Sequence, residues 1–182
     1  MLILRRAEIE DLSCIRQIYN EAVQTTVATF DTEPKTLEEQ RAWFENHGPR
    51  YPIFVAEADG VISGWASLSK WSERRAYSDT AEISLYVKEE FRGRRIGKKL
   101  LEAILEEGER VGLHTVIARI AGENRVSIHL HESLGFEHIG VMREVGRKFG
   151  KLLDVNLMQK IYPSKKPRGK DPGGIEKAKN CD

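Results

Sequence analysis

The segment of this chain best suited to chemistry is a turn of arginines and glycines that lies between a β-rich stretch and a helical pattern. It reads Arg92-Gly93-Arg94-Arg95-Ile96-Gly97. Small residues at a helix start let backbone N–H groups approach a phosphate closely, and the positive end of the helix dipole favours an anion there. The arginines add charge that suits a di-anion. The pattern predicts a phosphate-binding site, and the alternative is a basic, well-solvated helix start.

The surrounding elements that must position this turn can be predicted from hydrophobic periodicity. An Asp59-Gly60 pair predicts a hairpin turn, Thr36 followed by Glu39 predicts a capping box, and Asn124 is a typical helix N-cap. We expect helices over 12–23, 37–44, 96–111 and 124–134, and strands over 2–5, 52–57, 61–68, 80–87, 115–120, 136–145 and 152–161. Hairpins combined with strand–helix–strand crossovers predict a three-layer α/β (α+β) domain, in which helices flank a mixed sheet.

Length and composition indicate one globular domain. The chain has 182 residues, of which 40% are hydrophobic and 31% charged. No apolar run approaches the roughly 18 residues of a membrane span, so we expect no membrane association. Cys14 and Cys181 lie near opposite ends, which favours free thiols in a reducing compartment and a cytoplasmic location. We predict no metal site.

The last twenty residues differ in composition from the rest. Residues 163–182 carry six Lys/Arg against three Asp/Glu, with three Pro, three Gly and almost no apolar side chains. Such a segment buries too little surface to offset its ordering entropy. We therefore divide the chain into a domain over 1–162 and a disordered basic tail over 163–182. The domain holds 23 basic and 25 acidic groups, a balance that argues against nucleic-acid binding.

The arginine–glycine turn resembles the pyrophosphate motif Gln/Arg-x-x-Gly-x-Gly/Ala of the GNAT N-acetyltransferases. Arg95 stands where that family usually has its first glycine, so this position needs a backbone conformation that an L-residue can hold. Three further segments, 71–87, 124–136 and 146–155, resemble the phosphinothricin and methionine sulfoximine acetyltransferase branch. The similarity covers about residues 1–161 and implies a GNAT-like fold that uses acetyl-CoA.

The resemblance also implies roles for individual residues. An alkylammonium must lose a proton before it attacks a thioester, and Glu82 matches the position of the family's proposed base. The alternative is a half-buried glutamate in a strand pair. His131 matches a second position near the active centre, and its alternative is a packing histidine. Phe30 is expected to wall the acceptor pocket, or else to belong to the core.

The remaining site residues fall into two groups by the same resemblance. Backbone groups of Leu85, Tyr86 and Val87 would pair with the pantetheine arm like an added strand. Other residues expected to bind the cofactor are Arg92, Gly93, Arg94, Arg95, Ile96, Gly97 and Lys98 at the pyrophosphate, with Asn124 and Ser133 beside the pantetheine. The loop residues expected to bind the acceptor are Arg74, Arg75, Ala76 and Tyr77, and an arginine there would fork onto a substrate carboxylate.

These expectations combine into an acetyl-CoA-dependent N-acetyltransferase that modifies a small amino acid or analogue, of the phosphinothricin or methionine sulfoximine type. The alternatives are a protein N-terminal or lysine acetyltransferase and a non-catalytic acyl-CoA-binding sensor. The resemblance further implies a homodimer that takes a small-molecule amine as its acceptor.

Overall fold

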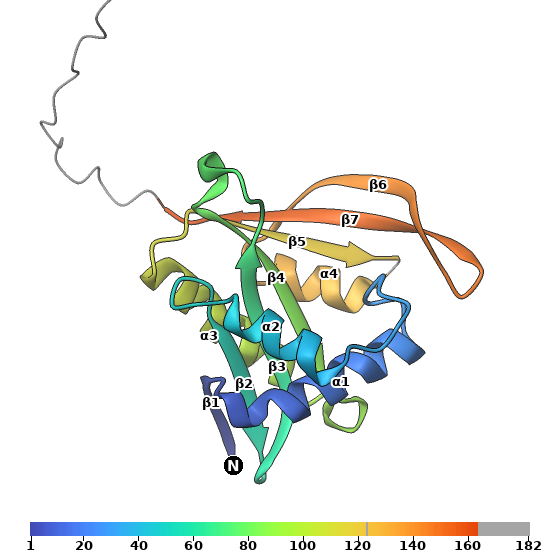
Figure 1. Ribbon diagram of the computed structural model, residues 1–182. Helices are drawn as coiled ribbons and strands as arrows, with labels where there is room; N and C mark the ends of the chain where they lie inside the picture. Colours follow the sequence, from blue (N-terminus) through green and yellow to red (C-terminus); the bar gives the residue numbers. More distant parts are fainter. Residues whose placement is uncertain (123, 164–182) are drawn as a thin grey trace, which may run out of the picture.

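A computed structural model describes residues 1–122 and 124–163 of the chain (Figure 1). Of the proposed tail, residues 164–182 lie outside the described residues. The longer elements follow the predicted order. They are β1 (Leu2–Arg6), α1 (Leu12–Thr25), α2 (Leu37–Glu45), β2 (Ile53–Ala58), β3 (Val61–Lys70), β4 (Thr80–Val87), α3 (Ile96–Arg110), β5 (Thr115–Ala121), α4 (Arg125–Glu132), β6 (Glu137–Lys148) and β7 (Lys151–Ile161).

Seven strands form one sheet in the order β1-β2-β3-β4-β5-β7-β6. Every neighbouring pair is antiparallel except β4 and β5, which run parallel because helix α3 carries the chain back between them. The predicted mixed sheet is therefore confirmed. Its single parallel pair lies in the middle of the sheet. There strand β4, the last of the β2–β3–β4 meander, pairs with β5, which in turn pairs with β7 of the β6–β7 hairpin.

Helices cover both faces of the sheet, which gives the three layers that the sequence predicts. Helix α1 packs Ile15 and Ile18 against Val55 and Trp65 on one face, with α2 beside it. Helix α3 packs Leu100, Leu101 and Ile104 against the other face, and α4 lies on this side too (Figure 1). Because successive side chains of a strand alternate between faces, β4 gives Ala81 and Ile83 to the α3 core and turns Glu82 toward the α1 side.

Local sequence signals correctly predict where these elements begin and turn. Asp59 and Gly60 both have positive φ, 53° and 80°, as a two-residue hairpin turn requires. The side chain of Thr36 accepts a hydrogen bond from the Glu39 amide, and the Glu39 carboxylate accepts one from the Thr36 amide. The Asn124 side chain accepts from the Ser127 amide at 3.0 Å. Both helix caps are therefore confirmed.

The β6–β7 hairpin is longer than predicted. Strand β6 continues to Lys148 rather than ending at residue 145, because Phe149 and Gly150 form a tight turn with φ of 48° and 76°. The apolar–polar alternation weakens in this strand because many of its side chains are exposed. Three short 3₁₀ turns, Ile9–Asp11, Arg75–Tyr77 and Glu89–Phe91, also escape prediction. No helix in the described part of the chain is long and apolar enough to cross a membrane.

Candidate active site

The site begins where strands β4 and β5 separate. Their parallel ladder covers Thr80–Ile83 and stops at the pair Ile83–Ala118, although β4 continues to Val87 and β5 to Ala121. Beyond that pair the β5-facing edge of β4 has no strand partner among residues 1–122 and 124–163. Backbone groups that leave a ladder need other partners, and an extended ligand can supply them as an added strand. This edge is formed by Leu85, Tyr86 and Val87, the residues predicted to bind pantetheine.

The arginine–glycine turn follows directly and leads into helix α3. Gly93 has φ of 76°, and Arg95, the N-cap, has φ of 61° and ψ of 11°. Arg95 thus holds the left-handed conformation that favours glycine, at a cost of about 1 kcal/mol for an L-residue. The first hydrogen bond of the helix runs from the Lys99 amide to the Arg95 carbonyl. The amides of Ile96, Gly97 and Lys98 are therefore left at the helix start, where an anion can accept from them.

The side chains of the turn surround this helix start. Arg92 donates from Nε to the Val87 carbonyl at 3.2 Å, and the Arg94 guanidinium lies 5.1 Å from the centre of the Phe91 ring. Both arginines are exposed, as are Gly93, Arg95 and Lys98. At Gly97 an added Cβ would lie 3.6–3.8 Å from side chains of β4 and α4, at ordinary contact distance. The cofactor residues of this turn are thus brought together, and their geometry fits a pyrophosphate.

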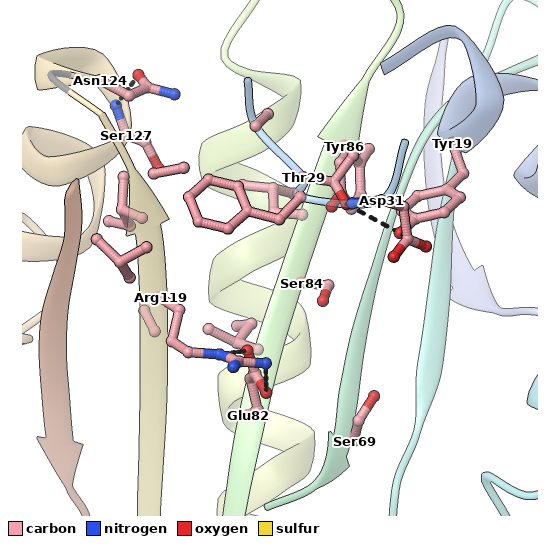
Figure 2. A pocket seen from close by; sticks show the side chains of 18 of the residues that line it. Tyr19, Thr29, Asp31, Ser69, Glu82, Ser84, Tyr86, Arg119, Asn124 and Ser127 are labelled. Atoms are coloured by element: carbon pink, nitrogen blue, oxygen red, sulfur yellow. Dashed lines mark hydrogen bonds and ion pairs between the residues drawn. The ribbon is translucent and has the colours of Figure 1, made fainter. Parts of the chain in front are cut away.

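A cavity of about 630 Å³ opens beside the strand separation on the α1 side (Figure 2). Its floor is formed by β4 and β5, and its walls by the loop between α1 and α2, by α2, by the start of α4 and by β6 and β7. The polar and charged side chains that line it are Tyr19, Thr29, Asp31, Lys35, Glu39, Gln40, Ser69, Glu82, Ser84, Tyr86, Arg119, Asn124, Ser127 and His131. These residues come from seven segments of the chain: α1, the loop after it, α2, β3, β4, β5 and α4 with its N-cap.

Glu82, the predicted base, faces this cavity and is held by an arginine from the neighbouring strand. Arg119 donates from Nε and Nη2 to the two carboxylate oxygens of Glu82, at 2.5 and 2.7 Å (Figure 2). The side chain of Glu82 is 21% exposed and that of Arg119 is 50% exposed. The Arg119 guanidinium also lies 5.8 Å from the centre of the Trp71 ring. The carboxylate is therefore oriented but remains open to the cavity.

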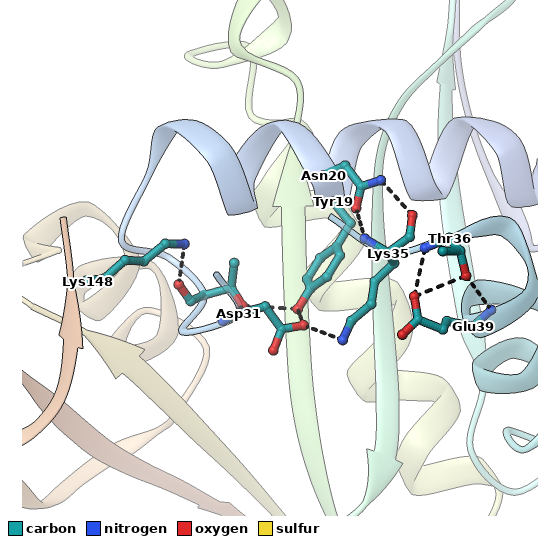
Figure 3. Close-up of polar contacts among 8 residues, drawn as sticks. Tyr19, Asn20, Asp31, Lys35, Thr36, Glu39 and Lys148 are labelled. Atoms are coloured by element: carbon teal, nitrogen blue, oxygen red, sulfur yellow. Dashed lines mark hydrogen bonds and ion pairs between the residues drawn. The ribbon is translucent and has the colours of Figure 1, made fainter. Parts of the chain in front are cut away.

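The loop between α1 and α2 closes the opposite side of the cavity through a polar network (Figure 3). Tyr19 donates to Asp31 at 2.7 Å, and the Lys35 ammonium lies 2.9 Å from the same carboxylate. Burial pushes the pKa of Asp31 up, but the hydrogen bonds from Lys35 and Tyr19 outweigh it, so the pKa lies below its ordinary value. Asn20 fixes the Lys35 backbone from both sides, at 2.7 and 2.9 Å. The loop is thus anchored firmly to helix α1.

A second set of contacts joins this loop to β6. Lys148 is only 4% exposed and donates to the Thr29 carbonyl at 2.8 Å. The Phe30 ring lies against Gly146 so closely that an added Cβ would be 2.2 Å from it. Phe30 lines the cavity, which agrees with its predicted place in the pocket wall. Gly146 is small because the ring needs the space.

His131 lies at the edge of the cavity but is held as a packed side chain. Its Nδ1 donates to the Ser127 carbonyl at 2.8 Å, its ring contacts Phe136 edge-on, and it is 4% exposed. Burial lowers its pKa, so the ring is neutral near pH 7 with the proton on Nδ1. Asn124 also lines the cavity. Ser133 does not, because its hydroxyl caps the end of α4 by donating to the Leu130 carbonyl at 2.7 Å.

The loop residues predicted to bind the acceptor lie elsewhere. Arg74, Arg75, Ala76 and Tyr77 form or flank an exposed 3₁₀ turn and do not line the cavity of the single chain. Their role stays a prediction. Sequence reasoning also missed Tyr19, Asp31, Lys35 and Arg119. The first three sit in a helical pattern and a polar loop with no distinguishing signal, whereas Arg119 was visible as a charge inside the otherwise apolar strand 115–120.

A mixed sheet that separates beside a basic helix start, with a carboxylate facing the adjoining cavity, defines the architecture of acyltransferases that use a coenzyme A thioester. Comparison with known proteins supports this assignment to the acyltransferases. Residues 15–136 match the profile of the Acetyltransferase (GNAT) family. The chain belongs to this family, so the family and fold predicted from sequence are confirmed.

The chain is also similar to individual acetyltransferases within this family. The chain is 41% identical to an L-methionine sulfoximine/L-methionine sulfone acetyltransferase of Pseudomonas aeruginosa, over 86% of this chain and 92% of that protein. Among solved structures, it resembles a GNAT superfamily phosphinothricin acetyltransferase from Sinorhizobium meliloti in complex with AcCoA (TM-score 0.87, 36% identity, 94% and 96% coverage). It also resembles a ribosomal-protein-alanine N-acetyltransferase from Brucella melitensis (TM-score 0.85, 38% identity, 88% and 99% coverage).

Proposed function

We propose that this protein transfers an acetyl group from acetyl-CoA to the α-amino group of a small amino acid or analogue, of the methionine sulfone or phosphinothricin kind. The observation that carries this proposal is the position of Glu82. Its carboxylate faces the cavity at the point where β4 and β5 part. An acceptor amine in that cavity lies between the carboxylate and the strand edge suited to the pantetheine arm.

The chain divides the binding of acetyl-CoA between backbone and side chains. The β5-facing edge of Leu85–Val87, where the Val87 carbonyl already accepts from Arg92 Nε, would pair with the pantetheine arm through its other backbone groups. The amides at the start of α3 would bind the pyrophosphate, with Arg92, Arg94 and Arg95 around them. When bound, acetyl-CoA supplies an acetyl group activated as a thioester. The groups of this chain bring the acceptor nitrogen toward that acetyl group and remove its proton.

Glu82 is the group that we assign to proton transfer. An α-amino group is mostly protonated at neutral pH and cannot attack while it is. Glu82 accepts the proton and leaves the nitrogen lone pair free, a contribution usually worth about 10²–10⁴ in rate. His131 is less suited because its Nδ1 is occupied by the Ser127 carbonyl and its ring is buried. We therefore propose Glu82 as the general base and His131 as a wall of the site.

The Brucella relative favours a second candidate, acetylation of protein N-terminal residues. An acceptor screen separates the two. The protein is given acetyl-CoA with L-methionine sulfone, L-methionine sulfoximine, phosphinothricin or a ribosomal-protein N-terminal peptide beginning with alanine, and the release of free coenzyme A thiol is followed. Preference for the amino-acid analogues supports the proposal. Turnover of the peptide alone would contradict it, and no turnover despite acetyl-CoA binding would favour the non-catalytic sensor.

We also propose that the protein is a cytoplasmic homodimer. In support, the β6–β7 hairpin exposes a row of apolar side chains, each between 44% and 57% exposed: Ile139, Val141, Val145, Phe149 and Leu152. Apolar patches of this kind are typical of protein interfaces. Light scattering on the purified protein tests the dimer, and Phe149→Ser should shift it toward monomer, whereas a wild-type monomer at micromolar concentration would contradict it.

A further inference from the structure

We infer that Arg119 binds the α-carboxylate of the acceptor while it holds Glu82. This inference rests on the proposed function, since it assigns the acceptor's second charged group to a residue of the same site. The juxtaposition that carries it is a carboxylate and a guanidinium side by side on the cavity floor (Figure 2).

The Arg119 guanidinium has one edge that Glu82 does not occupy. An arginine carries five N–H donors, which form two edges able to grip a carboxylate. Glu82 occupies the edge made by Nε and Nη2. The edge made by Nη1 and the second hydrogen of Nη2 has no hydrogen-bond partner among the described residues. Arg119 lines the cavity and its side chain is half exposed, so this second edge is accessible to a ligand.

The shape of an amino-acid acceptor matches this pair of side chains. In an α-amino acid the nitrogen and the carboxylate share one carbon atom, so the group that binds the carboxylate must lie next to the group that takes the proton. Arg119 and Glu82 meet this requirement because they are in direct contact. With the acceptor carboxylate on the free edge, the amine is carried to the Glu82 oxygen beside it. The two charges of the acceptor then alternate with the two charges of the protein.

The other basic group of the cavity is already paired and lies far from the base. Besides Arg119 and the neutral His131, the only basic side chain lining the cavity among the described residues is Lys35. Its ammonium is paired with Asp31 at 2.9 Å, in the network on the opposite wall. An acceptor bound there through its carboxylate would place its amine away from Glu82. The Arg119 guanidinium also lies 5.8 Å from the centre of the Trp71 ring, a cation–π contact that helps to hold it beside Glu82.

The test compares two acceptors that differ only in the carboxylate, L-methionine sulfone and its carboxamide. The measured quantity is the ratio of kcat/KM for acid to kcat/KM for amide, at saturating acetyl-CoA and fixed pH. We expect the wild-type protein to favour the acid by roughly 10–100-fold, the worth of a charge-assisted bidentate contact. In Arg119→Met the ratio should fall by roughly the same 10–100-fold, because the different basicity of the two amines contributes equally in both proteins. Any loss through poorer orientation of Glu82 affects both acceptors and cancels.

Matched variants make the result decisive. Arg41→Met removes an exposed arginine of α2 that does not line the cavity, and should leave the ratio unchanged. Arg119→Lys keeps the charge but loses the fork, and should give an intermediate ratio; it decides the question if Arg119→Met does not fold. An unchanged ratio in folded Arg119 variants would overturn the assignment, as would a collapse of the ratio in Arg74→Met or Arg75→Met alone. If the wild-type protein acetylates neither acceptor, the proposed function itself fails.

Discussion

The two halves of the site are built by different means. The cofactor half depends on backbone: an unpaired strand edge, a turn with two left-handed residues and a helix start, all within residues 84–98. The acceptor half depends on side chains that reach one cavity from seven segments, paired with one another across up to 37 residues of sequence. A contiguous backbone device tolerates exchange of its side chains, whereas an assembled set of charges does not. The following predictions test this difference.

The largest effect is expected at the base. Glu82→Gln keeps the shape of the side chain but cannot accept a proton at neutral pH, so kcat should fall by roughly 10²–10⁴. Acetyl-CoA affinity should barely change, because no cofactor contact is lost. The deficit should shrink as the pH rises and more free amine is present. His131→Gln is the comparison and should lose much less; near wild-type turnover in Glu82→Gln would refute the assignment.

The cofactor half should respond at Gly97. An added methyl there meets side chains of Leu85, Val87 and Leu130 at 3.6–3.8 Å, so Gly97→Ala should bind acetyl-CoA within about threefold of the wild-type protein, since ordinary contacts cost little. Gly97→Glu places a carboxylate at the helix start and should abolish acetyl-CoA binding by calorimetry while the fold survives. Equal affinities in the two variants would mean that the phosphates bind elsewhere.

Acidification should weaken the fold on both sides of the sheet. His47, on the α2 face, is held by the Trp43 carbonyl and Ser69, and His131 lies in α4 on the other face, at the edge of the cavity. Burial lowers the pKa of both. The unfolded chain therefore takes up their protons first, and stability falls as the pH drops below about 6.5. The melting temperature should fall by ~2–4 °C per kcal/mol lost. His131→Asn should show a flatter profile between pH 7 and 5.

The smallest effect concerns Arg95. Arg95→Gly removes the strain of a left-handed L-residue, about 1 kcal/mol, but adds backbone entropy to the unfolded chain. The free energy of unfolding should rise by at most about 1 kcal/mol. Acetyl-CoA affinity should fall modestly because the charge is missing. Arg95→Ala keeps the Cβ and should show the affinity loss without the gain. Thermal melts and acetyl-CoA affinities of the two variants separate the effect of the backbone conformation on stability from the effect of the charge on binding.

The same contrast explains how much could be predicted from sequence. Local signals such as the Asp59-Gly60 turn and the Thr36 capping box act between neighbouring residues, so the element order and the cofactor turn were predictable. The Glu82–Arg119 pair spans 37 residues and exists only because two parallel strands lie in register. The contact of Phe30 with Gly146 likewise depends on the path of a polar loop. The hydrophobic periodicity of a sequence does not specify such long-range contacts.

The short parallel ladder between β4 and β5 also has a kinetic consequence. The meander on one side and the β6–β7 hairpin on the other form from segments adjacent in the chain, and local contacts form fast. The ladder joins Thr80–Ile83 to partners 35 residues further on, with only four residue pairs, so it must wait for helix α3 to close the loop. Glu82 and Arg119 lie on the two strands that this β4–β5 ladder joins. Catalytic activity should therefore appear in the last folding phase, together with the β4–β5 ladder itself.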